Sequence, residues 1–315
     1  MRCPTLHLQR QRLRPASFID RWRNRDESDE SVAGSAKWVF VHIPRTGGTN
    51  LWHSVCHAFS DQGCPVRVED VFAYSIHHYK TILAASRTAT DFGLNQIPSN
   101  FASLIHHHTS YGLWRDLGPQ FRYFTLLRDP VERAISHYFH SLSLYFQIDP
   151  ATGNYVLSPK AIDFWHGDDA LPTLLEVAKQ HNLLSPEAIV AFTALHHGLA
   201  RNFYCDLFAR YLGIADEWAL QQTPRTLVDA RTVSLLSHAI PSYFQHLFFD
   251  LATAYDFLER TFQVTIHDRN RMRNAVWRPT ITDLDALRAA LTPYFEYDYL
   301  LLSKLRARMS SLHAC

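Results

Sequence analysis

This sequence of 315 residues has little of several features that define large classes of proteins. Its charges nearly cancel, with 31 Lys and Arg against 30 Asp and Glu, whereas general nucleic-acid binders carry a dominant basic face. It also contains no apolar run near the roughly 18 residues that a membrane-spanning helix needs. We therefore expect neither a nucleic-acid partner nor a transmembrane span.

Cysteine is scarce as well, and its pattern argues against a disulfide framework. There are five cysteines, an odd number, and none of them forms a C-x-x-C pair. Such a pattern is typical of reduced thiols in the cytosol. Residues 1–36 lack the apolar core of a signal peptide. The sequence thus predicts a soluble, cytoplasmic protein.

The composition of the chain changes after residue 36. The first 36 residues begin with an arginine-rich segment and end with "DESDESVAGSA", in which acidic residues are followed by small residues. This composition predicts a disordered tail. The remainder contains no internal repeat and no low-complexity linker. With 47% hydrophobic residues in the whole chain, it can bury a substantial core. We expect one globular domain over residues 37–315.

The stretch "WVFVHIPRTGGTNLW", residues 38–52, predicts a strand, a tight loop and a helix. Its β-branched and aromatic start is typical of a buried strand, Pro44 ends the strand, and two glycines permit a turn. Backbone N–H groups in such a loop, together with the N-terminus of a helix, form a site for an anion. A loop for ATP or GTP, however, has the pattern G-x-x-x-x-G-K-[ST], and the Gly-Lys-Ser/Thr ending is absent here.

A second motif lies in "FRYFTLLRDPVERAISHYFH", where a strand at 121–129 precedes an amphipathic helix at about 130–146. Arg128 stands at the end of the strand, and Ser136 follows on the helix. A guanidinium and a helix hydroxyl placed in this way can bind the same phosphate. Taken alone, the motif also fits an ion pair between Arg128 and Asp129 with Ser136 on the surface.

The rest of the chain indicates an α/β fold. Residues 149–169 have the composition of a long loop, and the segments after it favour helices. These helices are expected at 171–181, at 186–211 with a possible break, at 243–262, and at 283–309 with a break at Pro293. Strands that alternate with helices early in the chain indicate a parallel sheet. We expect a P-loop-like three-layer α/β/α fold with a central parallel sheet and a mostly helical C-terminal half.

Together, "FVHIPRTGGTNL" and "RDPVERAISHY" resemble the sulfotransferase superfamily that uses 3′-phosphoadenylyl sulfate (PAPS). The resemblance points in particular to carbohydrate sulfotransferases of the heparan-sulfate 2-O/6-O type and their bacterial relatives. It is strong over residues 38–52 and 121–140 and thin over the last hundred residues. It implies that the 5′-phosphosulfate of PAPS binds to Arg45, Thr46, Gly47, Gly48, Thr49 and Asn50. It further implies that Arg128 and Ser136 bind the 3′-phosphate.

The position of Arg45 is usually a lysine in this family. Either cation can neutralise the bridging oxygen as charge builds on the leaving phosphate. Arginine presents a wider, planar fork than the compact ammonium of lysine, so the two are not equivalent in geometry. The resemblance therefore implies a catalytic role for Arg45 in addition to donor binding.

The stretch "LIHHHTSYGLW" provides a candidate general base, which sulfuryl transfer to a hydroxyl requires. It resembles the family pattern G-H-x-x-[FY]-G-L, which selects His108 and leaves His107 in place of the glycine. A structural or substrate-binding role for His108 is the alternative. A metal site is disfavoured, because consecutive residues of an extended segment point to opposite faces. His140, on the expected helix at 130–146, matches a position that faces the acceptor in some 6-O-type relatives, which implies contact with the acceptor. A solvated helix face is the alternative.

The resulting expectation is transfer of a sulfuryl group from PAPS to an acceptor hydroxyl, with release of adenosine 3′,5′-bisphosphate (PAP) and without a metal. The acceptor class implied by the family is a saccharide or glycan, followed by a lipid-linked or small-metabolite hydroxyl. Two alternatives remain open at this point. One is a kinase with a degenerate P-loop, and the other is a catalytically silent nucleotide-binding protein of the same fold.

Overall fold

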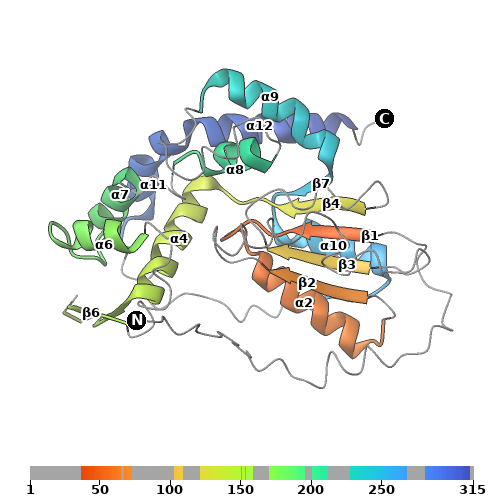
Figure 1. The fold of residues 1–315 in the computed structure, drawn as a ribbon, viewed down its shortest axis with the longest axis horizontal. Coiled ribbons are helices and arrows are strands. Elements are labelled where there is room, and N and C mark those ends of the chain that lie inside the picture. Colours follow the sequence, from red (N-terminus) through yellow and green to blue (C-terminus); the bar gives the residue numbers. More distant parts are fainter. Residues whose placement is uncertain are drawn as a thin grey trace, which may run out of the picture.

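The computed structural model describes residues 37–64, 67–72, 103–108, 121–149, 151–152, 154–158, 170–195, 201–211, 228–267 and 281–312. The expected N-terminal tail lies outside these described residues. The described part is a mixed α/β structure in which helices flank a sheet (Figure 1). Among the described helices, none has both the length and the apolar character needed to cross a membrane.

Five strands form a parallel sheet in the order β2-β3-β1-β4-β7. They are β1 (Lys37–Val41), β2 (Arg67–Phe72), β3 (Ser103–His108), β4 (Phe121–Leu126) and β7 (Phe244–Phe248). Because all neighbouring pairs are parallel, the carboxyl ends of the strands lie along one edge of the sheet. The loops that follow β1 and β4 therefore emerge side by side. The expectation of a parallel sheet is confirmed.

Helices follow the strands that carry the two sequence motifs. α2 (Gly48–Asp61) follows β1, α4 (Pro130–Tyr145) follows β4, and α10 (Leu251–Phe262) follows β7. The other helical elements are α6 (Ala170–Ala178), α7 (Pro186–Leu195), α8 (Phe203–Tyr211), α9 (Ala230–Tyr243), α11 (Leu284–Leu291), the 3-10 turn η6 (Thr292–Phe295) and α12 (Glu296–Leu312). A short antiparallel hairpin joins β5 (Phe146–Ile148) to β6 (Tyr155–Leu157).

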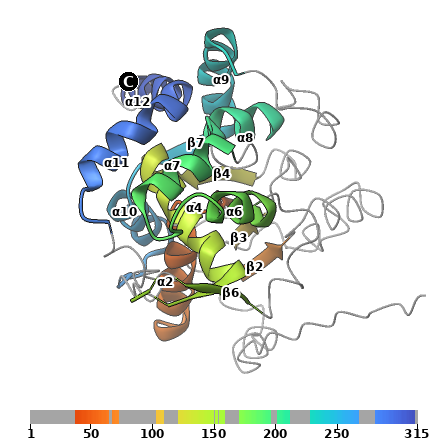
Figure 2. The same ribbon diagram turned by 90° about the vertical axis from the view of Figure 1, so that its left-hand side faces the viewer.

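The central strand β1 is buried on both faces, as its continuous apolar sequence predicts. Trp38 and Phe40 pack into a cluster with side chains of α2 and α10. Val39 and Val41 point to the opposite face, because strand side chains alternate, and they pack with α8, α9 and α12. Figures 1 and 2 show α8, α9 and α12 gathered on one side of the molecule, away from α2.

Several expected helices are confirmed. The helix at 130–146 is α4, and its start is fixed by Asp129, whose carboxylate caps the backbone N–H of Glu132 at 2.9 Å. The segment 186–211 contains two separate helices, α7 and α8. The segment 283–309 breaks at Pro293, where η6 separates α11 from α12.

Other expectations are wrong. The helix expected at 243–262 begins only at Leu251, because residues 244–248 form β7 and pair with β4. The apolar residues of this segment fit a helical period as well as a strand, so the contact with β4 decides its structure. The loop expected at 149–169 includes β6. The helix α9 was not anticipated, although Asp229 caps it and apolar residues recur along its buried face.

The order of the strands places β1 and β4 at a point where the chain changes direction. From β1 the chain continues through α2 to β2 at one edge of the sheet, whereas from β4 it continues to β7 at the other edge. In open α/β sheets, ligands bind in the crevice at the carboxyl ends of such neighbouring strands. Both sequence motifs lie at the carboxyl ends of β1 and β4.

Candidate anion-binding site

The loop between β1 and α2 is tightly folded. The hydroxyl of Thr46 donates to the carbonyl of Ile43 at 2.9 Å, and the carbonyl of Gly47 accepts the first backbone bonds of α2. Two residues of the loop have left-handed backbone angles, with φ of 101° at Gly47 and 70° at Arg45. Glycine adopts this conformation freely, but arginine rarely does, and such residues concentrate at functional sites.

Gly48 has no room for a side chain. A Cβ atom there would lie 2.2 Å from Cδ2 of His42 and 2.8 Å from Cζ of Phe40. The ring of His42 is buried and stacks on Phe40 with the centroids 5.5 Å apart. The second glycine of the motif therefore lets the start of α2 approach the end of β1 closely.

We expect Gly48→Ala to destabilise the fold by about 1–3 kcal/mol, the usual cost of inserting a methyl group into a packed site. The free energy of unfolding should be measured by urea denaturation. Ser60→Ala, on an exposed position of the same helix, is the matched control and should change little. An unchanged denaturation midpoint for Gly48→Ala would show that His42 moves aside without cost.

Arg128 precedes α4, and Ser136 lies in the second turn of this helix. Pro130 occupies the first turn of the helix, so Arg128 lies in the segment between β4 and α4. The phenol of Tyr204 fixes the backbone of Arg128, accepting from its N–H at 3.0 Å and donating to its carbonyl at 2.9 Å. Asp129 caps α4 and also accepts a hydrogen bond from the hydroxyl of Tyr299 at 2.8 Å.

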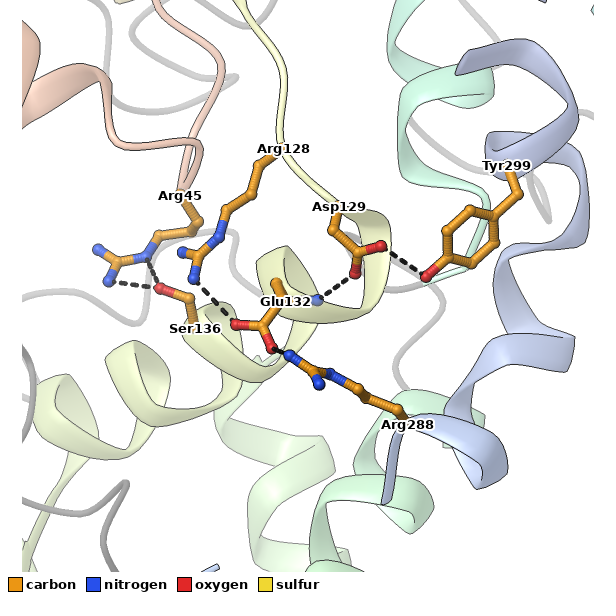
Figure 3. Close-up of polar contacts among 7 residues, drawn as sticks. All are labelled: Arg45, Arg128, Asp129, Glu132, Ser136, Arg288 and Tyr299. Atoms are coloured by element: carbon orange, nitrogen blue, oxygen red, sulfur yellow. Dashed lines mark hydrogen bonds and ion pairs between the residues drawn. The ribbon is translucent and has the colours of Figure 1, made fainter. Parts of the chain in front are cut away.

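The two sequence motifs meet through Arg45 and Ser136 (Figure 3). Nε and Nη2 of Arg45 donate to the hydroxyl of Ser136 at 3.3 and 3.1 Å, across 91 residues of sequence. The side chain of Arg128 lies beside them and donates from Nη2 to Oε2 of Glu132 at 3.1 Å. The fold thus brings together one residue from the loop and two from the strand–helix motif.

The carboxylate that pairs with Arg128 is Glu132, one helical turn away, and not its neighbour Asp129. Glu132 is shared, because its other oxygen accepts from Nη2 of Arg288 at 2.7 Å. Within the described residues, Arg45 has no carboxylate at ion-pair distance, and its side chain donates to the hydroxyl of Ser136. Among the described side chains, positive charge is therefore only partly neutralised where the two motifs meet.

Burial and the neighbouring charge of Arg128 lower the pKa of Arg45 to about 10, so that Arg45 remains a cation at neutral pH. A third guanidinium, that of Arg133, is buried against the ring of Phe203, with Cζ 3.8 Å from the ring centroid. Burial lowers the pKa of Arg133 to about 10. These cations repel one another, and an anion with more than one negative charge would relieve that repulsion.

A buried acid lies close to this group of cations. Burial raises the pKa of Asp298 to about 6, although the carboxylate accepts from the backbone N–H groups of Tyr204 and Cys205 at 3.2 and 2.9 Å. These bonds cap the N-terminus of α8 from α12. Asp298 therefore holds the helix that carries Tyr204, the residue that fixes the backbone of Arg128.

His140 follows Ser136 by one turn on α4. Burial, and then the charge of Arg45, lower the pKa of His140 to about 4, so the imidazole is neutral at pH 7. A neutral imidazole offers one donor and one acceptor to a hydroxyl. This environment is compatible with the expected role of His140 toward an acceptor, which stays a prediction.

His108 is the last residue of β3, and its side chain lies outside the described part of the structure. The preceding residue, His107, pairs in register with Val41 at the end of β1. The backbone of His108 therefore lies at the same edge of the sheet as the loop that carries Arg45. The sheet register is compatible with the expected role of His108, which stays a prediction.

The remaining residues of the expected 5′ loop lie at the start of α2. Thr49 is partly exposed in the first turn, whereas Asn50 is buried and donates to the hydroxyl of Tyr255 at 3.4 Å. The side chain of Asn50 therefore contributes to packing between α2 and α10. In the described part of the chain, no group of three or more His, Cys, Asp or Glu residues is arranged to hold a metal ion.

The residues that support Arg128 were not predicted from their positions in the sequence. Glu132 stands in the first turn of α4, only four residues after Arg128, so the short spacing of these opposite charges was a signal for this pair. Tyr204 and Arg288 come from distant segments that have no recognisable motif.

No protein-family model matches this chain, and no curated protein matches it significantly.

Proposed function

We propose that this protein is a PAPS-dependent sulfotransferase, which transfers a sulfuryl group from PAPS to an acceptor hydroxyl and releases PAP. The observation that carries the proposal is the contact of Arg45 with Ser136 beside the side chain of Arg128. It joins the two motifs that would hold the two ends of this donor, the 5′-phosphosulfate and the 3′-phosphate.

The fold supports this proposal through the position of the site. Helices on both faces of the parallel sheet are compatible with a P-loop-like three-layer α/β/α fold, which we include in the proposal. The β1–α2 loop would bind the 5′-phosphosulfate with its backbone N–H groups and Arg45. Arg128 and Ser136 would bind the 3′-phosphate, which an ATP-like nucleotide lacks.

The proposed reaction is an in-line displacement at sulfur. The acceptor oxygen forms a bond to sulfur while the bond from sulfur to the 5′-phosphate oxygen breaks. His108 would take the proton of the acceptor hydroxyl, and Arg45 would stabilise the charge that develops on the leaving oxygen. From the resemblance, a saccharide or glycan is the proposed acceptor class, with a lipid-linked or small-metabolite hydroxyl second.

A panel of nucleotides in a thermal-shift measurement tests this function. A ligand that binds only the folded state raises the apparent melting temperature as its concentration rises. PAP and PAPS should stabilise the protein more than AMP, ATP or GTP at equal concentration. Stabilisation by ATP but not by PAP would instead support the degenerate kinase.

A catalytically silent protein of the same fold would show the same preference for PAP. It is distinguished by turnover, measured as release of PAP from PAPS in the presence of candidate acceptors. A panel of saccharides, lipid-linked hydroxyls and small alcohols would identify the acceptor class. Specific binding of PAP without turnover on any of these acceptors would favour the silent protein.

A further inference from the structure

Helix α11 reaches the first turn of α4 through one ion pair (Figure 3). Nη2 of Arg288 lies 2.7 Å from Oε1 of Glu132, while Oε2 of the same carboxylate lies 3.1 Å from Nη2 of Arg128. Three side chains thus form a continuous chain from α11 to the candidate site. The side chain of Glu132 at its centre is only 13% exposed, so its contacts are partly shielded from water.

The carboxylate of Glu132 pairs with both guanidiniums through different oxygens, Oε2 with Arg128 and Oε1 with Arg288. A carboxylate that faces a single arginine can bind it with both oxygens in a bidentate pair. Arg288 holds Oε1 away from Arg128, which leaves Arg128 with one bond to Glu132 and with further N–H groups for an anion. Without Arg288, Oε1 of Glu132 would lose this partner, and the carboxylate could bind Arg128 bidentately and compete with a phosphate.

The fold around Arg128 has other supports that do not involve Arg288. Tyr204 fixes its backbone, and Tyr299 of α12 binds the capping residue Asp129. Arg288 itself is 45% exposed and makes its other ion pair with Asp285, one turn earlier on α11. Truncation of Arg288 should therefore alter the charge around Glu132 without unfolding the domain.

We propose that Arg288 is a positioning residue for the 3′-phosphate site, acting through Glu132 on the guanidinium of Arg128. This inference rests on the proposed function. It extends the donor site beyond the two sequence motifs to a helix near the C-terminus, where the resemblance to the family is thin.

The test compares PAP with AMP, which lacks the 3′-phosphate, by calorimetric titration of the full chain. Arg288→Ala should weaken PAP binding by about 3- to 10-fold, the size of coupling expected within one charge network, and leave AMP binding unchanged. Arg288→Lys retains a cation for Glu132 and should restore most of the affinity. Arg260→Ala is the matched control, because Arg260 is also exposed in the last turn of its helix and should have no effect.

A double-mutant cycle with Glu132→Gln isolates the route of the effect. The amide carries no charge to compete for Arg128, so Arg288→Ala should have little effect on PAP binding in the Glu132→Gln background. Equal losses for PAP and AMP in Arg288→Ala, or additive effects in the cycle, would overturn the positioning role. A third outcome would also overturn the positioning role but leave the proposed function intact. In that outcome, Arg128→Ala abolishes the preference for PAP, whereas Arg288→Ala keeps it. A wild-type protein with no preference for PAP over AMP would overturn both.

Discussion

Replacing His108 with alanine should reduce turnover by about 10²–10⁴-fold, the usual contribution of a positioned general base, while PAP affinity stays nearly unchanged. The reason is that His108 would remove the proton of the acceptor hydroxyl but would not contact the donor phosphates. Turnover is measured as release of PAP from PAPS with a working acceptor. PAP affinity is measured in parallel by calorimetry, so that loss of chemistry is separated from loss of folding.

His106→Ala and His107→Ala are the controls for this prediction. Both lie on β3 beside His108, so each variant causes a comparable local change. If one of these is inactive while His108→Ala is active, the base is a neighbouring histidine and the match to the family pattern is shifted. Near-normal turnover in all three variants would remove this stretch from the mechanism.

Replacing Arg128 with alanine should weaken PAP binding by about 2–4 kcal/mol, because a charge-assisted contact to the phosphate is lost. In the same calorimetric titration, Ser136→Ala removes only a neutral hydroxyl and should cost about 0.5–1.5 kcal/mol. Neither variant should change the affinity for AMP. The backbone bonds of Arg128 to Tyr204 do not involve the replaced side chain, which favours a folded variant.

Arg128→Lys separates the contribution of positive charge at this position from that of the planar guanidinium. It keeps the positive charge but loses the planar fork, so an intermediate loss of PAP affinity would indicate bidentate binding of the 3′-phosphate. Equal losses of PAP and AMP affinity in Arg128→Ala would instead mean that Arg128 supports the fold. The assignment of the 3′ site would then have to be withdrawn.

The local structure of both motifs could be read from the sequence. The apolar run before Pro44 predicted the buried strand β1, and the Asp129-Pro130 pair marks the start of α4 by capping and by a fixed backbone angle. These features depend on neighbours within a few residues, so periodicity and turn chemistry are sufficient. The second glycine, Gly48, is explained only by a contact in the folded chain, where the ring of His42 occupies the space of a side chain.

Segments whose sequence fits two structures were decided by tertiary contacts. Residues 244–248 match a helical period, yet they form β7, because the edge of β4 offers unpaired backbone groups. The capping residue Asp250, which accepts from the N–H of Thr253 at 2.8 Å, marked the true start of α10.

What the sequence alone determined is the local structure of the candidate site: a glycine loop between a strand and a helix, an arginine just before the next helix, and a serine on that helix. What only the tertiary structure decided is how these parts act on one another. The contact of Arg45 with Ser136 spans 91 residues and that of Glu132 with Arg288 spans 156. No local pattern encodes such pairs, because the order of the strands and the packing of α11 on the rest of the fold bring them together. The same packing lets one carboxylate bind two arginines, and in our proposal this sharing sets how much of Arg128 is left for a phosphate.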